Sequence, residues 1–253
     1  DFDILVPNNK AVEAVNLLRN LGWTSEYKIP KNIIPIMHSC GYTNSNGLHH
    51  LDLHWHLLIE SCQSDDDDDF WVGALQTKIN NIPVYVLNPA DFFLHICIHG
   101  MKWSIIPPFR WVADAMFVLN LTKHEFDWNR LITQARKRHL TFPLLNGLEY
   151  LINNFNAPVP AEILTRIREI PISKTEKTEY KYKIENQKKM LLGNVPVLWF
   201  DSLRLSGSNN LIYKLLGFAK YAQLFWNLKH LWQLPFYTLF LSVRKIKRII
   251  YQK

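Results

Sequence analysis

The chain begins with a short apolar run next to acidic residues and continues with a segment of helical periodicity. Ile4–Val6 is apolar and favours β-structure, and it ends at Pro7-Asn8-Asn9, which is a turn signal. From Lys10 to Gly22 the apolar residues recur at helical spacing, and Gly22 stands where a C-cap glycine is expected. The pattern predicts a strand, a turn and a helix.

Two later segments predict strands, and a helix follows the second of them. Residues 51–57 alternate large apolar with polar side chains, and residues 84–87 form another short strand-like run. Pro89 followed by Asp91 is typical of a helix start. We expect this helix to end near Gly100.

The second half of the chain is patterned as helices. Asp127 is expected to be the N-cap of a helix, and helical periodicity continues to about Phe155. Residues 158–189 are more polar and rich in lysine, which predicts helical segments and a connector. We therefore predict an α+β fold, in which a small mixed β-sheet with flanking helices is followed by a mainly α-helical C-terminal region.

Carboxylates stand at matching places in two of the predicted strands. Side chains alternate along a strand, so Asp1 and Asp3 point to one face, and Asp52 joins them if its strand lies alongside. Mg²⁺ prefers oxygen ligands, and two such ions can hold the attacking and leaving oxygens of a phosphoryl transfer. The three carboxylates are therefore candidate metal ligands.

Composition is that of a globular protein. The 253 residues are 48% hydrophobic and 13% aromatic, which is enough for one large or two modest domains. The three cysteines, Cys40, Cys62 and Cys97, are widely spaced and form no Cys-x-x-Cys pair, so they indicate neither a disulfide framework nor a structural zinc site. No secretion signal is visible at the start, and we expect a cytoplasmic protein.

These motifs resemble the nucleotidyltransferase superfamily that includes DNA polymerase beta, and in particular its bacterial group of uncharacterised nucleotidyltransferases. The resemblance covers roughly residues 1 to 150. The matching residues are Asp1-Phe2-Asp3-Ile4-Leu5-Val6, Leu21-Gly22-Trp23, Leu51-Asp52-Leu53-His54-Trp55, His99-Gly100, Trp103, Arg110-Trp111, Asp114 and Asp127-Trp128.

The resemblance implies a catalytic core at 1–88, a helical domain completing the cleft at 89–157, and a helical C-terminal region at 158–253. It implies that Asp1, Asp3 and Asp52 are catalytic and bind Mg²⁺ or Mn²⁺. The expected reaction transfers a nucleoside monophosphate from a nucleoside triphosphate to an unidentified acceptor and releases pyrophosphate.

One element of the family is missing, a Gly-Gly or Gly-Ser turn about ten residues before the first Asp. We expect that the chain lacks its natural N-terminus. The alternative is a degenerate enzyme in which triphosphate binding is lost.

Two cations and a histidine are further candidates for contacts with the nucleotide or the acceptor. Lys102 and Arg110 lie near the predicted Pro107-Pro108 turn, where a fixed positive charge would offset phosphate charge in the transition state. Arg110 also stands one helical turn from Asp114, so an ordinary intrahelical ion pair is the alternative. His54 follows Asp52 on the same strand face and is a candidate substrate contact.

A zinc-dependent hydrolase is a rival interpretation. His54 and His56 form a His-x-His pattern on the predicted strand, with His49 and His50 close by. We favour the carboxylate interpretation, because the zinc alternative leaves Asp1 and Asp3 unexplained.

The formal net charge of +7 is unevenly distributed along the chain. Residues 65–69 are five consecutive aspartates, interpreted as a solvated loop between two strands. The basic residues are dispersed and no basic motif interleaved with aromatics appears, so nucleic acid is a less suitable partner.

The tail from 211 to 253 combines apolar, aromatic and basic residues. That composition is typical of a helix on an anionic membrane surface, which would place the protein peripherally at the inner face of the membrane. The same aromatics could instead pack on the catalytic domain or on a second subunit. A non-catalytic membrane-associated or partner-binding protein derived from the fold is therefore a second rival.

Overall fold

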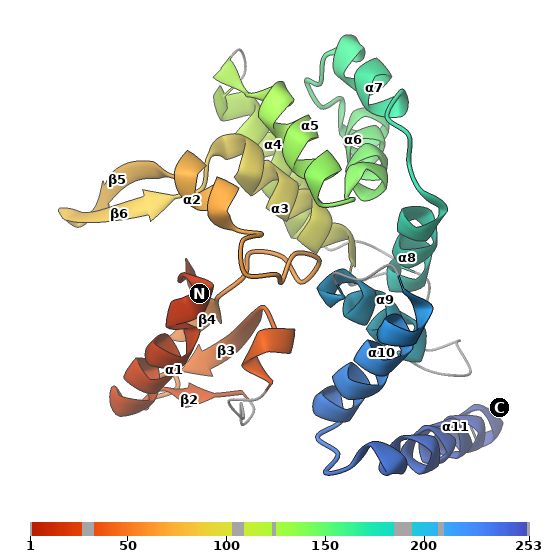
Figure 1. The fold of residues 1–253 in the computed structure, drawn as a ribbon. Coiled ribbons are helices and arrows are strands. Elements are labelled where there is room, and N and C mark those ends of the chain that lie inside the picture. The colour runs from red at the N-terminus through yellow and green to blue at the C-terminus, as the bar shows by residue number, and fades with distance from the viewer. Residues whose placement is uncertain are drawn as a thin grey trace. The chain divides into compact units, whose positions relative to one another are not determined.

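A computed structural model describes residues 2–26, 33–102, 109–122, 125–184, 194–206 and 210–251 (Figure 1). The chain falls into two compact units, and each is described by itself below. Unit 1 comprises Asp1–Asp67 with Met190–Lys253, and unit 2 comprises Asp68–Lys189. The three domains expected from the sequence stay a prediction.

Unit 1 contains a four-stranded mixed sheet, as predicted. Its strand order is β1-β4-β3-β2, with β1 and β4 parallel and the other pairs antiparallel. The elements of this part are β1 (Phe2–Leu5), a 3₁₀ turn η1 (Asn8–Lys10), α1 (Ala11–Asn20), β2 (Thr24–Ser25), a 3₁₀ turn η2 (Ile34–Ile36), β3 (Ser39–Thr43) and β4 (His50–His54).

The helix predicted after the first strand is confirmed as α1, and its end follows from a glycine. Gly22 has φ of +81°, a left-handed conformation that costs glycine no steric strain. Its N–H donates to the carbonyl of Arg19 and so satisfies one of the last helical acceptors.

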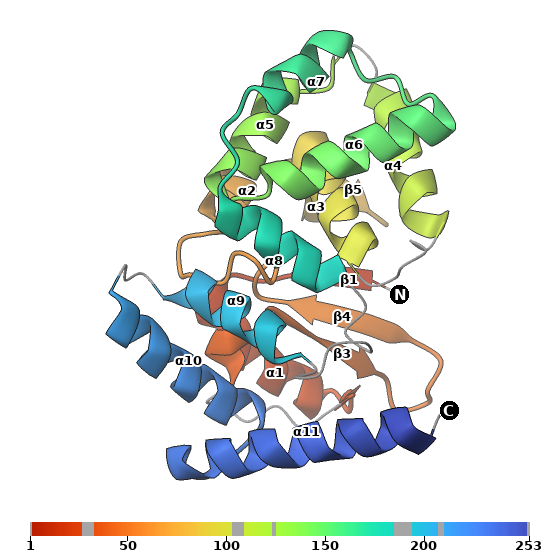
Figure 2. The ribbon, with the colours of Figure 1, turned by 90° about the vertical axis from the view of Figure 1, so that its right-hand side faces the viewer.

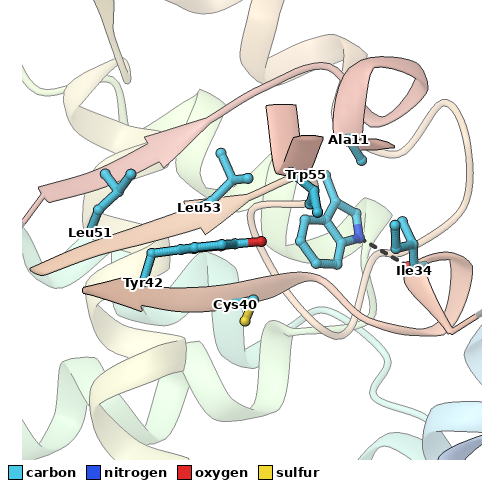
Figure 3. Close-up of a cluster of buried hydrophobic side chains, with 8 residues drawn as sticks. Ala11, Ile34, Cys40, Tyr42, Leu51, Leu53 and Trp55 are labelled. Carbon is cyan, nitrogen blue, oxygen red and sulfur yellow. Dashed lines mark hydrogen bonds between the residues drawn. The ribbon is translucent and has the colours of Figure 1, made fainter. Parts of the chain in front are cut away.

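One face of the sheet forms a hydrophobic core with α1. Leu51, Leu53 and Trp55 are buried there, which is the alternation that the sequence predicts for residues 51–57. Trp55 Nε1 donates to the carbonyl oxygen of Ile34 at 3.0 Å (Figure 3). It also donates to the carbonyl oxygen of Met37 at 2.6 Å, so the indole is both packed and hydrogen-bonded. Polar side chains of β4 are left to the other face.

The C-terminal part of unit 1 is helical. It consists of α9 (Val195–Leu205), α10 (Leu211–Phe225), a 3₁₀ turn η4 (Leu231–Gln233) and α11 (Leu234–Tyr251). α9 runs beside α10 (Figure 2). The ring centroids of Trp199 on α9 and Phe218 on α10 are 5.3 Å apart. A hydrogen bond joins α9 to the N-terminal part of unit 1: the guanidinium of Arg204 donates to the carbonyl oxygen of Glu60 at 3.1 Å. None of the helices within the described ranges has the length and apolarity needed to cross a membrane.

Unit 2 is a helical bundle with a β-hairpin. The hairpin turn consists of Asn80 and Asn81, both at positive φ, as a tight two-residue turn requires. The elements are α2 (Asp68–Gly73), β5 (Leu75–Ile79), β6 (Ile82–Val86), α3 (Pro89–Lys102), α4 (Phe109–Thr122), α5 (Trp128–Lys137), α6 (Thr141–Phe155), α7 (Ala161–Arg168) and α8 (Lys174–Ile184).

The predicted helix boundaries of unit 2 agree with the structure to within about two residues. The Asp127 carboxylate accepts from the N–H of Arg130 at 2.8 Å and so caps α5, and α6 ends at Phe155. α3 ends at Lys102, close to Gly100, near which its end was expected. Gly100 is a packing position rather than a cap, since a Cβ there would overlap the side chain of Trp111 on α4.

The interpretation of residues 65–69 as a solvated loop between two strands holds for Asp65, which is exposed in a turn, but not for Asp67, Asp68 and Asp69. Asp67 is buried, and its carboxylate lies 2.7 Å from Nδ1 of His56. Asp68 and Asp69 begin α2, and Asp69 pairs with Lys137 at 2.5 Å, which lowers the pKa of Asp69. The later part of the acidic run is therefore divided between a buried contact of Asp67 with His56 and the N-terminus of α2, where negative charge is favourable.

Candidate functional site

Two of the three predicted carboxylates lie side by side on the sheet. β1 and β4 are parallel neighbours, and Asp3 is the register partner of Asp52. Adjacent strands are about 4.8 Å apart, and paired residues point to the same face. The sequence placed Asp52 beside Asp3 only on the condition that their strands are neighbours, and the structure meets this condition. Asp1 lies outside the described residues.

The exposure of the two carboxylates differs, and so does their access to a ligand. The Asp3 side chain is 72% exposed at the edge strand, whereas Asp52 on the inner strand is half-buried. An exposed carboxylate beside a partly buried one can bind a cation that still contacts solvent or substrate. Oxygen donors of this kind suit Mg²⁺ and Mn²⁺.

His54 lies against the exposed carboxylate. Its Nε2 is 3.4 Å from Oδ1 of Asp3, and the residue is buried at 7% exposure. The His38 ring packs edge-on against it, with ring centroids 5.7 Å apart. A buried ring fixed in this way can hold the orientation of the Asp3 carboxylate.

Glu26 is a carboxylate of the site that the sequence analysis missed. It follows β2, and its N–H donates to the carbonyl of Gly41 at 3.0 Å. A Cβ placed on Gly41 would lie 2.8 Å from Oε1 of Glu26 and 3.0 Å from Oδ1 of Asp52. The missing side chain of Gly41 therefore lets two carboxylates approach one another over β3.

A comparison with protein families assigns the chain to a family. A family model described as "Uncharacterised nucleotidyltransferase" matches residues 1–156, which include the whole sheet and most of unit 2. The chain belongs to this family. The resemblance noted from the sequence is thereby confirmed, and the general chemistry of the protein is nucleotidyl transfer. No curated protein and no solved structure matches the chain.

The carboxylates of this site are donors of the type that a hard divalent cation prefers. Asp3 and Asp52 both offer carboxylate oxygens from one face, and Glu26 adds another beside Asp52. The part of the chain that the structure describes contains no preformed group of three or more His, Cys, Asp or Glu side chains that could hold a metal. A complete site would therefore draw further ligands from Asp1, water or the substrate phosphates.

The histidines of the zinc alternative are used differently in the nucleotidyltransferase. His56 lies beyond the end of β4, where its Nδ1 is 2.7 Å from Oδ2 of Asp67, and the other oxygen of Asp67 accepts from the N–H of Leu57 at 3.1 Å. This buried contact fixes the chain after β4. His54 faces Asp3 rather than His56, so the structure gives no support to the zinc-dependent hydrolase.

Lys102 and Arg110 belong to unit 2 of the nucleotidyltransferase. Lys102 is the last residue of α3, and its side chain lies outside the described part. Arg110 is exposed in the first turn of α4, one turn before Asp114. The turn at Pro107-Pro108 also lies outside the described residues. The suggested phosphate contacts of both cations stay predictions.

Proposed function

We propose that the protein is a metal-dependent nucleotidyltransferase that moves a nucleoside monophosphate from a nucleoside triphosphate to a hydroxyl or phosphate of an acceptor. The observation that carries the proposal is the pairing of Asp3 with Asp52 within the region matched by the family model. Two carboxylates on neighbouring strands can share a cation that also contacts phosphate oxygens.

In the proposed reaction, Asp3 and Asp52 hold the divalent cation together with Asp1. Bound Mg²⁺ or Mn²⁺ supplies positive charge that neutralises the triphosphate and lowers the cost of charge development. The acceptor oxygen forms a bond to the α-phosphorus, the bond from that phosphorus to the bridging oxygen breaks, and pyrophosphate leaves. The acceptor's proton passes to a carboxylate, for which Asp52 is our assignment.

The neighbouring residues have supporting roles in this proposal. His54 orients the Asp3 carboxylate through its contact at 3.4 Å. Glu26 adds negative charge beside Asp52 and so strengthens cation binding. Lys102 and Arg110 are our candidates for the cations that offset the charge of the phosphates.

Calorimetric titration with non-hydrolysable nucleoside triphosphates tests this function. We expect Mg²⁺-dependent binding by the wild type and about 10- to 100-fold weaker binding by Asp3→Asn and Asp52→Asn, the range found when metal sites lose supporting groups. Asp65→Asn is the matched control, because it removes an exposed acid of the same unit. Equal binding by all variants, or binding by none, would contradict the proposal.

A second proposed property is peripheral contact with an anionic membrane through residues 211–253. This segment contains Lys and Arg but neither Asp nor Glu. α11 exposes a stripe of large apolar side chains at helical spacing, with Phe236 at 67%, Leu239 at 63% and Phe240 at 55%. Exposed apolar surface with only positive charge suits an anionic lipid surface, whereas two copies of such a surface would repel each other.

Cosedimentation with vesicles tests the membrane contact. We expect binding to vesicles that contain phosphatidylglycerol, little binding to pure phosphatidylcholine, and weakening by salt. The double variant Phe236→Glu/Phe240→Glu should abolish it, while Leu17→Glu, an exposed position on α1, should not. Salt-independent binding, or equal binding by both variants, argues against the contact.

A further inference from the structure

Unit 1 contains a cavity in its C-terminal part that the catalytic proposal does not use. Its volume is about 490 Å³, and it lies between η2, α9 and α10. Small-molecule sites are typically 300–1,000 Å³ and mainly apolar. The cavity is therefore large enough for part of a ligand.

The walls of the cavity are mainly apolar. Ile36, Leu205 and Leu224 contribute aliphatic surface. Ser202 also lines it, but its hydroxyl donates to the carbonyl of Trp199 at 2.7 Å and is satisfied within the protein. A wall of this kind favours hydrocarbon over water.

A glycine of α10 is among the residues that line the cavity. Gly217 lines the cavity, and a Cβ placed there would meet no atom within 4 Å. Glycine in a helix interior is less favourable than alanine. At this position a larger side chain would extend into empty space rather than into a packed neighbour.

One charged residue stands among those that line the cavity in the described part of the chain. Lys220 lies three residues after Gly217 on the same helix, and it both lines the cavity and is exposed to solvent. The surrounding segment 211–253 contains no acid that would compete for an anion. Apolar walls with a single exposed cation suit a molecule with a hydrocarbon chain and an anionic end.

We infer that this cavity binds the hydrocarbon chain of an anionic amphiphile, with the carboxylate or phosphate end at Lys220. The inference rests on the cavity and its charge, and it holds whether or not the protein transfers nucleotides. The same chemistry is offered by a soluble alkyl phosphate or fatty acid and by a lipid taken from an anionic membrane.

Titration calorimetry with decyl phosphate below its critical micelle concentration tests the inference. We expect saturable binding at one site, with affinity rising about fourfold for each added methylene group. Gly217→Phe fills the cavity and should abolish binding, while circular dichroism shows that its helix content is retained. Lys220→Gln should weaken binding about tenfold, and Lys229→Gln, an exposed lysine that does not line the cavity, should leave it unchanged.

Three results would overturn the inference: no binding by the wild type, equal binding by Gly217→Phe, or equal loss in the two lysine variants. Vesicle binding then distinguishes the two sources of the amphiphile. If the ligand is a membrane lipid, Gly217→Phe also weakens cosedimentation with phosphatidylglycerol vesicles. If the ligand is soluble, Gly217→Phe leaves vesicle binding unchanged.

Discussion

At the scale of single residues, unit 2 contains a buried carboxylate paired with an arginine. The Asp91 side chain is fully buried, and its carboxylate accepts hydrogen bonds from Nε of Arg130 at 2.9 Å and from Nη2 of Arg130 at 2.6 Å. Burial raises the pKa of Asp91, and the Arg130 guanidinium opposes that shift. Because removal of one partner leaves an uncompensated buried charge, the pair is costly to break even where its net contribution is small.

Arg130→Gln should therefore destabilise the protein by about 3–5 kcal/mol at pH 7, measured by urea unfolding. An acid whose pKa is raised in the folded state favours folding when protonated, so the loss should shrink as the pH falls towards 4. Arg166→Gln, which removes an exposed arginine bonded to Asn129, should change stability by less than about 0.5 kcal/mol. A pH-independent loss would contradict the assignment of the effect to Asp91.

Gly41 offers a second prediction at this scale. In Gly41→Ala the new Cβ would meet the carboxylate of Glu26 and push this flexible side chain away from Asp52. If Glu26 strengthens cation binding, Gly41→Ala and Glu26→Gln should each weaken Mn²⁺ binding about fivefold, the effect of one charge at about 1 kcal/mol. The double variant should bind Mn²⁺ no more weakly than Glu26→Gln does. Additive losses of Mn²⁺ affinity in the double variant would count against this role of Glu26.

Asp3, Asp52 and His54 were predicted from the sequence, because the alternation of side chains along a strand decides which of them share a face. Glu26 was not, because its position depends on the pairing of β2 with β3 and on the missing side chain of Gly41. Neither the two-residue strand β2 nor β3, with its polar and glycine content, carries a strong alternation signal.

At the scale of elements, the contact of α3 with α4 depends on one glycine. A Cβ on Gly100 would overlap Cβ of Trp111, which belongs to the helix framework and cannot swing aside. Gly100→Ala should therefore lower the free energy of unfolding by about 1–3 kcal/mol, despite the better helix propensity of alanine. In Gly217→Ala the new methyl group meets open space. This variant should instead raise the free energy of unfolding by about 0.5–1 kcal/mol, measured in the same way by urea unfolding. A gain in both variants would show that α3 and α4 can separate without cost.

The same glycine shows what periodicity can and cannot predict for elements. Gly22 and Gly100 both stand late in a helical pattern, and only Gly22 ends its helix. The distinction is made by a neighbouring helix, which the local pattern does not contain. Asp127, whose capping partner is only three residues away, was predicted correctly.

At the scale of the whole molecule, unit 1 is built from the two ends of the chain. Arg204 and Glu60 meet although they are far apart in the sequence. Local periodicity carries no information on which distant segments pack together, so the cavity between η2, α9 and α10 could not be predicted. The apolar and basic character of residues 211–253 could be predicted, because it is a property of composition and spacing.

The central claim is that Asp3 and Asp52 form a cation site for nucleotidyl transfer. Electron paramagnetic resonance of Mn²⁺ tests it most directly, because the signal of free Mn²⁺ falls as the ion binds. With a non-hydrolysable nucleoside triphosphate present, the wild type and Asp65→Asn should bind Mn²⁺ alike, and Asp52→Asn should bind it at least about tenfold more weakly. Equal Mn²⁺ binding by the wild type and Asp52→Asn would contradict the claim.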